Sequence, residues 1–166
     1  PTGCMATAVG ILMKYHGYPE QARPENRVPS YNDLSISYGS YDWNNMPNEL
    51  TGSSAAEHIG AVSNLLWQVG ANMRMRYKLE ESSAYIDDAL VAMRDVFGYS
   101  RQMKHLLQSF SDMDYSWEEW ERIIHEELDN GRPVLYGSET ETRVDAFYGK
   151  AHAFICDGYD TYGRFH

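Results

Sequence analysis

The residues best suited to chemistry are a cysteine near the start of the chain and a histidine near its end. Cys4 follows Thr2-Gly3 and opens an apolar stretch with helical spacing. The first N–H groups of a helix have no partner within it, and the positive end of the helix dipole lies beside them. Both features favour the thiolate form of cysteine, which is the nucleophile. The alternative is a buried cysteine that packs like any small apolar side chain.

A cysteine nucleophile needs a base, and His152 is the best-placed histidine. It begins an apolar strand directly after a glycine-bearing loop, and strand ends beside loops are where rigid catalytic side chains are presented. His16 would lie about 18 Å from Cys4 by helical rise and is excluded. His58 and His125 fall within expected amphipathic helices, where a solvent-facing or half-buried side chain is the ordinary outcome.

The second cysteine, Cys156, competes with His152 for Cys4. Strand alternation places His152, Phe154 and Cys156 on one face. Cys156 would then lie about 13 Å from His152, at ~3.3 Å per residue, whereas a disulfide requires Cα atoms within about 7 Å. Either His152 activates Cys4 or Cys4 pairs with Cys156. We expect the first, with Cys156 as an inert core residue.

Other classes of function have little support in the sequence. It holds no Cys-x-x-Cys and no His-Glu-x-x-His, so we expect neither a metal nor another cofactor. The net charge of −10 argues against a nucleic-acid partner, because phosphate binding needs a basic surface. The sequence has no apolar run that approaches the roughly 18 residues of a membrane span.

The elements that must position these residues are helical first and extended later. A nearly wholly apolar helix is expected over 4–16, central and buried, and others over 54–70, 84–97 and 116–131. Ser54-x-x-Glu57 and Ser116-x-x-Glu119 resemble capping boxes at two of their starts. Strands are expected over 134–136 and 151–157. This order predicts an α+β fold with antiparallel pairing, and 166 residues fit one domain.

Four groups of segments follow one another in a characteristic order. They are Thr2 to Ala8 with Met13 to Pro19, then Tyr41 to Pro47, then Val69-Gly70 and Met75 to Tyr77 with Phe97 to Ser100, and finally Gly131 to Tyr136 with His152 to Asp160. In this combination they resemble the streptopain family of papain-like cysteine peptidases. The resemblance covers most of the chain.

The resemblance implies a papain-like α+β fold, in which a helical part with the buried active-site helix packs on an antiparallel β-sheet or barrel part. It implies Cys4 as nucleophile and as a backbone N–H donor to the oxyanion, and His152 as general base and then general acid. The activity implied is that of a cysteine endopeptidase, which hydrolyses protein or peptide substrates through a thioester.

The family also carries a glutamine upstream of the cysteine and an Asn-Trp segment downstream of the histidine. We therefore expect 1–166 to be a single peptidase domain truncated at both ends, without these residues and without an N-terminal inhibitory propeptide. The resemblance implies a bacterial zymogen that is secreted or located at the cell surface.

Two further interpretations stay open. The loop between Gly137 and Gly149 is expected to bind substrate as a flap beside the cleft, and an ordinary hairpin connection is the alternative. The alternative function is a catalytically weak or inactive papain-like module that acts in binding or adhesion. Amidase or transglutaminase-like transfer is a third possibility, because the same Cys-His pair serves acyl transfer to other acceptors.

Overall fold

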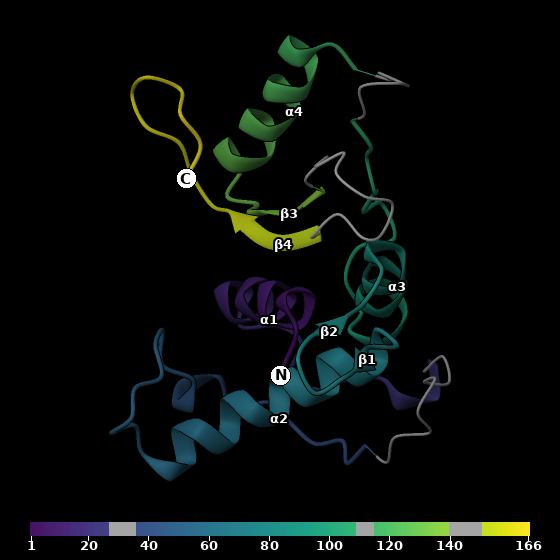
Figure 1. Cartoon of the computed structure of the whole chain (residues 1–166), viewed down its shortest axis with the longest axis vertical. Coiled ribbons are helices and arrows are strands. Elements are labelled where there is room, and N and C mark those ends of the chain that lie inside the picture. Colours follow the sequence, from purple (N-terminus) through teal and green to yellow (C-terminus); the bar gives the residue numbers. More distant parts are fainter. Residues whose placement is uncertain (27–35, 109–114, 140–150) are drawn as a thin grey trace. The chain divides into compact units, whose positions relative to one another are not determined.

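A computed structural model describes residues 1–26, 36–108, 115–139 and 151–166. The chain divides into two compact units, Pro1–Met103 and Lys104–His166 (Figure 1). The first unit is mainly helical and the second combines one helix with a β-hairpin, so the expected α+β class is confirmed.

The first helix of the first unit, α1 (Cys4–His16), has the predicted limits. Gly17 ends it in the left-handed conformation, with φ 55°, and its N–H bonds the carbonyl of Lys14, as expected for a glycine in this position. Most of α1 is buried, but Ile11 and Tyr15 are more than half exposed. The expectation of a central, buried helix is confirmed for most of its side chains, with these two as exceptions.

Helix α2 (Ala56–Asn72) packs against α1, and the two lie side by side in Figure 1. They approach closely at Gly10, where an added Cβ would lie 2.6 Å from Leu66 Cδ2. The predicted capping box at Ser54 is wrong. The Ser54 hydroxyl accepts a 2.7 Å hydrogen bond from the N–H of Thr51, and α2 begins without a side-chain cap. The helix also continues past Gly70, where it was expected to end.

The remainder of the first unit consists of short elements. Two 3₁₀ turns, η1 (Pro24–Asn26) and η2 (Trp43–Asn45), lie in the irregular segment before α2. Strands β1 (Arg76–Tyr77) and β2 (Ser82–Ser83) pair antiparallel. Helix α3 (Ile86–Val91) continues into a turn of π-helix, η3 (Ala92–Val96). The largest fully buried side chains among the described residues all lie in this unit: Val9, Met13, Gln68, Val69, Met73, Met75, Met93, Val96 and Phe97.

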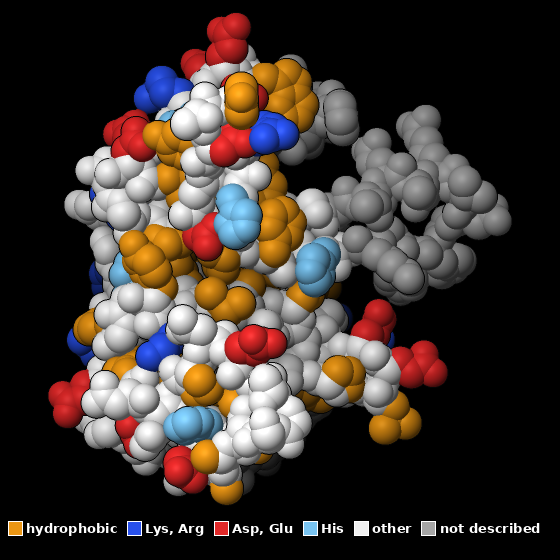
Figure 2. All heavy atoms as spheres, turned by 90° about the vertical axis from the view of Figure 1, so that its left-hand side faces the viewer, with side chains coloured by type: hydrophobic (Ala, Val, Ile, Leu, Met, Phe, Trp, Pro, Cys, Tyr) orange, Lys and Arg blue, Asp and Glu red, His pale blue; other side chains and the backbone are white. Residues whose placement is uncertain are grey.

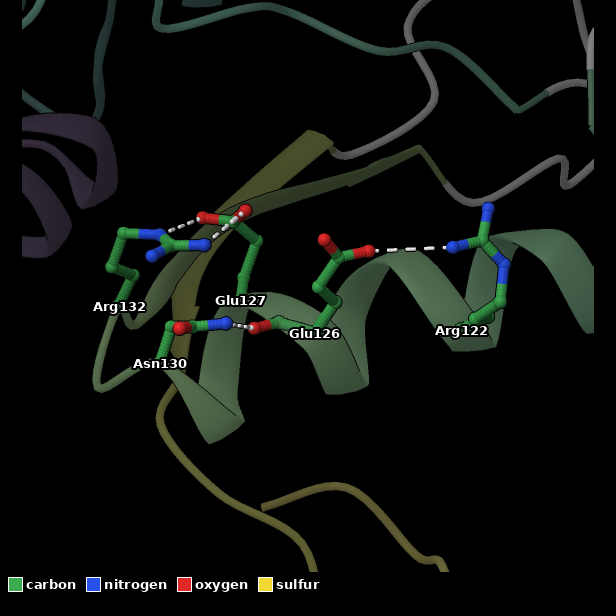
Figure 3. Close-up of polar contacts among 5 residues, drawn as sticks. All are labelled: Arg122, Glu126, Glu127, Asn130 and Arg132. Atoms are coloured by element: carbon green, nitrogen blue, oxygen red, sulfur yellow. Dashed lines mark hydrogen bonds and ion pairs between the residues drawn. The ribbon is translucent and has the colours of Figure 1, made fainter.

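The second unit begins with helix α4 (Trp117–Asp129), and here the predicted capping box is present. The Ser116 hydroxyl accepts from the N–H of Glu119 at 3.2 Å, and the Glu119 carboxylate accepts from the N–H of Ser116 at 2.9 Å. At the other end, Arg132 donates two hydrogen bonds to Glu127 (Figure 3). These contacts fix the turn that leads from α4 into the hairpin.

The hairpin consists of β3 (Val134–Glu139) and β4 (Ala151–Cys156), paired antiparallel. Its register places Tyr136 opposite Phe154 and Ser138 opposite His152. Strand β3 runs three residues beyond the predicted strand, because Gly137 pairs with Ala153 and does not open the loop. After β4 the chain turns back, with a bridge between Tyr159 and Phe165.

The described helices are all too short or too polar to cross a membrane. On the face drawn in Figure 2, Lys and Arg side chains are scattered among acidic and neutral ones. This distribution accords with the acidic balance of the sequence.

Candidate active site

The cysteine half of the candidate site is the start of α1. Cys4 is its first residue and is half-buried. The carbonyl of Gly3 accepts hydrogen bonds from both the N–H and the hydroxyl of Thr7, at 3.2 and 3.1 Å. No side chain caps this helix start, and its first turn holds no acidic residue. The first N–H groups and the positive end of the dipole are thus available to negative charge at Cys4.

The backbone just before Cys4 is held in a conformation that requires glycine. Gly3 has φ 86°, and a Cβ on it would lie 2.9 Å from the carbonyl oxygen of Ser82 and 3.0 Å from Cε of Met75. The Ser82 hydroxyl donates a 2.6 Å hydrogen bond to the carbonyl of Pro1. Strand β2 therefore fixes the three residues before the cysteine. This role of Ser82 was missed, because a serine in a short strand carries no distinctive sequence signal.

The histidine half lies on β4. His152 is exposed and stands opposite Ser138. Its ring stacks with that of Phe154, with centroids 6.3 Å apart and planes 25° apart. The predicted shared face of these two residues is therefore confirmed. The part played by Phe154 was missed, although the alternation along the strand already put the two rings on one face.

Cys4 lies in the first unit and His152 in the second. Their pairing as nucleophile and base stays a prediction. The predicted substrate loop lies largely outside the described residues, since 140–150 are not described. Among the described residues, no cluster of three or more His, Cys, Asp or Glu side chains could hold a metal ion.

The second cysteine, Cys156, is a buried free thiol, and Cys4 is also a free thiol. The preference for two unpaired cysteines stays a prediction. Burial has the largest effect and raises the pKa of Cys156; a backbone hydrogen bond with Gly158 opposes this increase, and the neighbouring carboxylate of Asp157 adds to it. A raised pKa keeps the thiol protonated and unreactive at neutral pH. Cys156 therefore fits the expected inert role.

Two other described histidines have neighbours that account for them. His125 packs between the rings of Tyr159 and Phe165, with centroids 4.1 and 4.9 Å away. His166 Nδ1 lies 2.7 Å from a carboxylate oxygen of Asp157. No local sequence pattern indicates this hydrogen bond, which joins the residue after β4 to the last described residue.

The comparisons with known proteins agree on one group. The model of the peptidase C10 family matches residues 1–166. The chain is 29% identical to the thiol protease/hemagglutinin PrtT of Porphyromonas gingivalis over 99% of its length and 18% of that protein. It is 30% identical to streptopain of Streptococcus pyogenes over 99% of its length and 42% of that protein. It thus spans less than half the length of these curated relatives.

Solved structures with the same fold come from Prevotella intermedia. The active wild-type cysteine protease interpain A matches with a TM-score of 0.74 at 29% identity, over 99% of this chain and 68% of that one. A fragment of prointerpain A matches with a TM-score of 0.73 at 27% identity, over 99% of this chain and 51% of that one.

Proposed function

The chain belongs to the peptidase C10 family, and we propose that it is the peptidase domain of a cysteine endopeptidase, with Cys4 as nucleophile and His152 as general base and acid. The observation that carries the proposal is the position of Cys4 at an uncapped helix start in a chain that the family model matches from end to end. The two compact units are taken as parts of one papain-like domain over 1–166.

The reaction would proceed in two steps. In the first, the Cys4 thiolate bonds to the carbonyl carbon of the substrate, the C–N bond breaks, and the imidazolium of His152 gives its proton to the departing amine. In the second, water adds to the thioester, His152 takes the proton of that water, and the thiolate leaves. The uncapped N–H of Cys4 would donate to the oxyanion in both steps.

The proposal extends to the substrates, the propeptide and the location of the protein. The relatives are named proteases, and one solved relative is a pro-form, which supports protein or peptide substrates and an inhibitory propeptide that makes the protein a zymogen. A bacterial protein that is secreted or held at the cell surface is consistent with these relatives. The segment between Gly137 and Gly149 would lie beside the bound substrate.

A second candidate function is suggested by the name of one relative, which combines thiol protease with hemagglutinin. In that case the chain would be a catalytically weak or inactive module that acts in binding or adhesion. The two candidates differ in the reactivity of one thiol and in peptide hydrolysis, which are measured directly.

The decisive experiment compares alkylation and peptide hydrolysis across matched variants of the purified protein. We expect Cys4→Ala to lose rapid alkylation and to lower kcat/KM at least about 10³-fold, and His152→Ala to lower hydrolysis by a similar factor. Cys156→Ala and His58→Gln are the controls and should keep both properties. Rapid hydrolysis by Cys4→Ala would refute the nucleophile, and a wild-type protein with a slow thiol and no hydrolysis would favour the binding module.

A further inference from the structure

We propose that Phe154 is a positioning residue for His152, and that Tyr136 and Trp120 in turn hold the ring of Phe154 in place. This inference rests on the proposed role of His152 as general base. It concerns only the second unit, in which all four side chains lie, and it assigns a task to an aromatic cluster that the reaction itself does not use.

Three rings follow one another on one face of the hairpin. The ring of Tyr136 on β3 stacks with that of its cross-strand partner Phe154, with centroids 5.4 Å apart and planes 27° apart. The ring of Phe154 in turn stacks with that of His152 at 6.3 Å and 25°. Both centroid separations fall in the range in which aromatic pairs attract one another. Among the described residues, the imidazole is therefore at one end of a near-parallel series of three rings.

Tyr136, the ring of the series that is farthest from His152, contacts helix α4. The indole N–H of Trp120 donates a 2.7 Å hydrogen bond to the hydroxyl of Tyr136, and the two rings meet edge to face at 6.2 Å. Trp120 lies in the first turns of α4, close to the capping box formed by Ser116 and Glu119. The helix start is thus well anchored, and it holds Tyr136 in place against Phe154.

The described ring contact of His152 is with a neighbour on its own strand. Its cross-strand partner Ser138 carries only a hydroxymethyl group, so the ring of Phe154 is its large described neighbour on that face. An exposed imidazole samples several staggered rotamers, and an adjacent ring favours those in which the two planes stack. An aromatic pair of this kind shifts such an equilibrium about three- to tenfold.

The exposure of Phe154 supports this interpretation. Its side chain is 40% exposed, so a large apolar ring at this position gains only part of the stabilisation that full burial gives. Burial alone therefore does not explain a phenylalanine at this position, whereas contact with the imidazole does. The same unit holds a natural control, because Phe165 is 38% exposed and meets His125 at 4.9 Å.

The test compares Phe154→Leu with Phe165→Leu by NMR and by kinetics. In Phe154→Leu we expect the ring-current shifts of the His152 ring protons to disappear, with those of His125 unchanged. Phe165→Leu should change the shifts of His125, which the ring of Tyr159 also contacts, and should leave those of His152 unchanged. With a peptide substrate, Phe154→Leu should lower kcat about three- to tenfold with little change in KM, and Phe165→Leu should leave both unchanged. Phe154→Tyr keeps the ring and should restore kcat.

Three results would overturn the proposal. The His152 signals could be the same in Phe154→Leu and wild type, Phe154→Tyr could be as slow as Phe154→Leu, or Phe154→Leu could keep the wild-type kcat while His152→Ala is inactive. Full activity in His152→Ala would instead overturn the proposed function itself. The NMR comparison needs no activity, so these failures are distinguishable, and Phe154→Tyr covers the case in which Phe154→Leu does not fold.

Discussion

The hydroxyl of Tyr41 donates a 2.6 Å hydrogen bond to the side-chain carbonyl of Gln68, and both residues are buried. Tyr41 belongs to the irregular segment before α2, and Gln68 lies within that helix. The amide of Gln68 also donates to the carbonyl of Ser37 at 3.1 Å. The buried side chain of Gln68 thus holds Tyr41 and Ser37, two residues of a segment with little regular structure of its own, against α2.

Removing the Tyr41 hydroxyl should destabilise the first unit. Tyr41→Phe leaves the buried Gln68 carbonyl without this donor, which typically costs about 1–3 kcal/mol. Each kcal/mol lowers Tm by about 2–4 °C in a chain of this size. Thermal unfolding measures the loss. The control is Tyr38→Phe, whose half-buried hydroxyl donates to Asn72 at 2.9 Å, and it should lose less. Equal losses would show that the deeper burial of the Tyr41 hydroxyl does not matter here.

The same tyrosine should make stability depend on alkaline pH. Burial raises the pKa of Tyr41 well above its ordinary value, and the nearby hydroxyls of Tyr38 and Tyr99 add to the increase. The folded protein therefore holds its proton where the unfolded chain ionises. The contribution is complete below about pH 10 and is lost as the pH rises further.

Urea unfolding at a series of pH values between about 9 and about 11 tests this dependence. Wild type should lose stability steadily across the upper half of the range, and Tyr41→Phe should show a shallower decline. Tyr162→Phe, in which an 84% exposed ring is altered, should follow wild type. Parallel curves for wild type and Tyr41→Phe would contradict the prediction.

The elements that the sequence predicts well are those whose signals are local. The limits of α1 follow from the apolar run and from Gly17, and the start of α4 follows from Ser116 and Glu119. Ser54 has the same spacing to an acidic residue but lies within a tight turn. Its hydroxyl accepts a hydrogen bond from the Thr51 N–H and does not cap α2. A spacing rule cannot distinguish a cap from such a turn, because both satisfy the same serine oxygen.

The features that could not be predicted depend on distant contacts. Gly70 lies inside α2 and does not end it. A glycine is needed at this position because the hydroxyl of Tyr77 from β1 occupies the space that a Cβ would take. At the candidate site, alternation was enough to put His152 and Phe154 on one face. The pairing of Tyr136 with Phe154 was not readable, since it follows from the register of the whole hairpin.

The two serines that resemble helix caps provide a direct comparison. Ser116→Ala should destabilise the second unit by about 0.5–2 kcal/mol, the usual range for a lost N-cap. Ser54→Ala should have little effect on α2, because its hydroxyl bonds a turn and not the helix. Circular dichroism during urea unfolding measures both variants. A larger loss for Ser54→Ala would contradict this assignment of the caps.

The capping box should also make stability depend on acid pH. Hydrogen bonds from the backbone and hydroxyl of Ser116 lower the pKa of Glu119. A lowered pKa contributes stability that is present above the unfolded value of about 4.3 and is lost as the pH falls through the folded value. Acid unfolding of Glu119→Gln should therefore be less steep than that of wild type over this range. Glu118→Gln, one position away in the same first turn, is the control, and an equal change in both variants would refute the role of the capping box.

The approach to Cys4 offers the sharpest link between backbone geometry and reactivity. In Gly3→Ala the new Cβ meets the Ser82 carbonyl at 2.9 Å, at a backbone position with φ 86° and ψ 139° that is costly for any other residue. Such positions cost about 1–3 kcal/mol in backbone strain alone, so the segment must shift and carry the start of α1 with it. Gly17→Ala also has a positive φ but meets no atom within 4 Å, and its cost should be about 1 kcal/mol. Both variants should lower the urea midpoint, but Gly3→Ala should in addition slow alkylation of Cys4 several-fold under conditions in which both are folded. Equal alkylation rates in the two folded variants would show that the contact between Gly3 and Ser82 does not govern the presentation of the thiol.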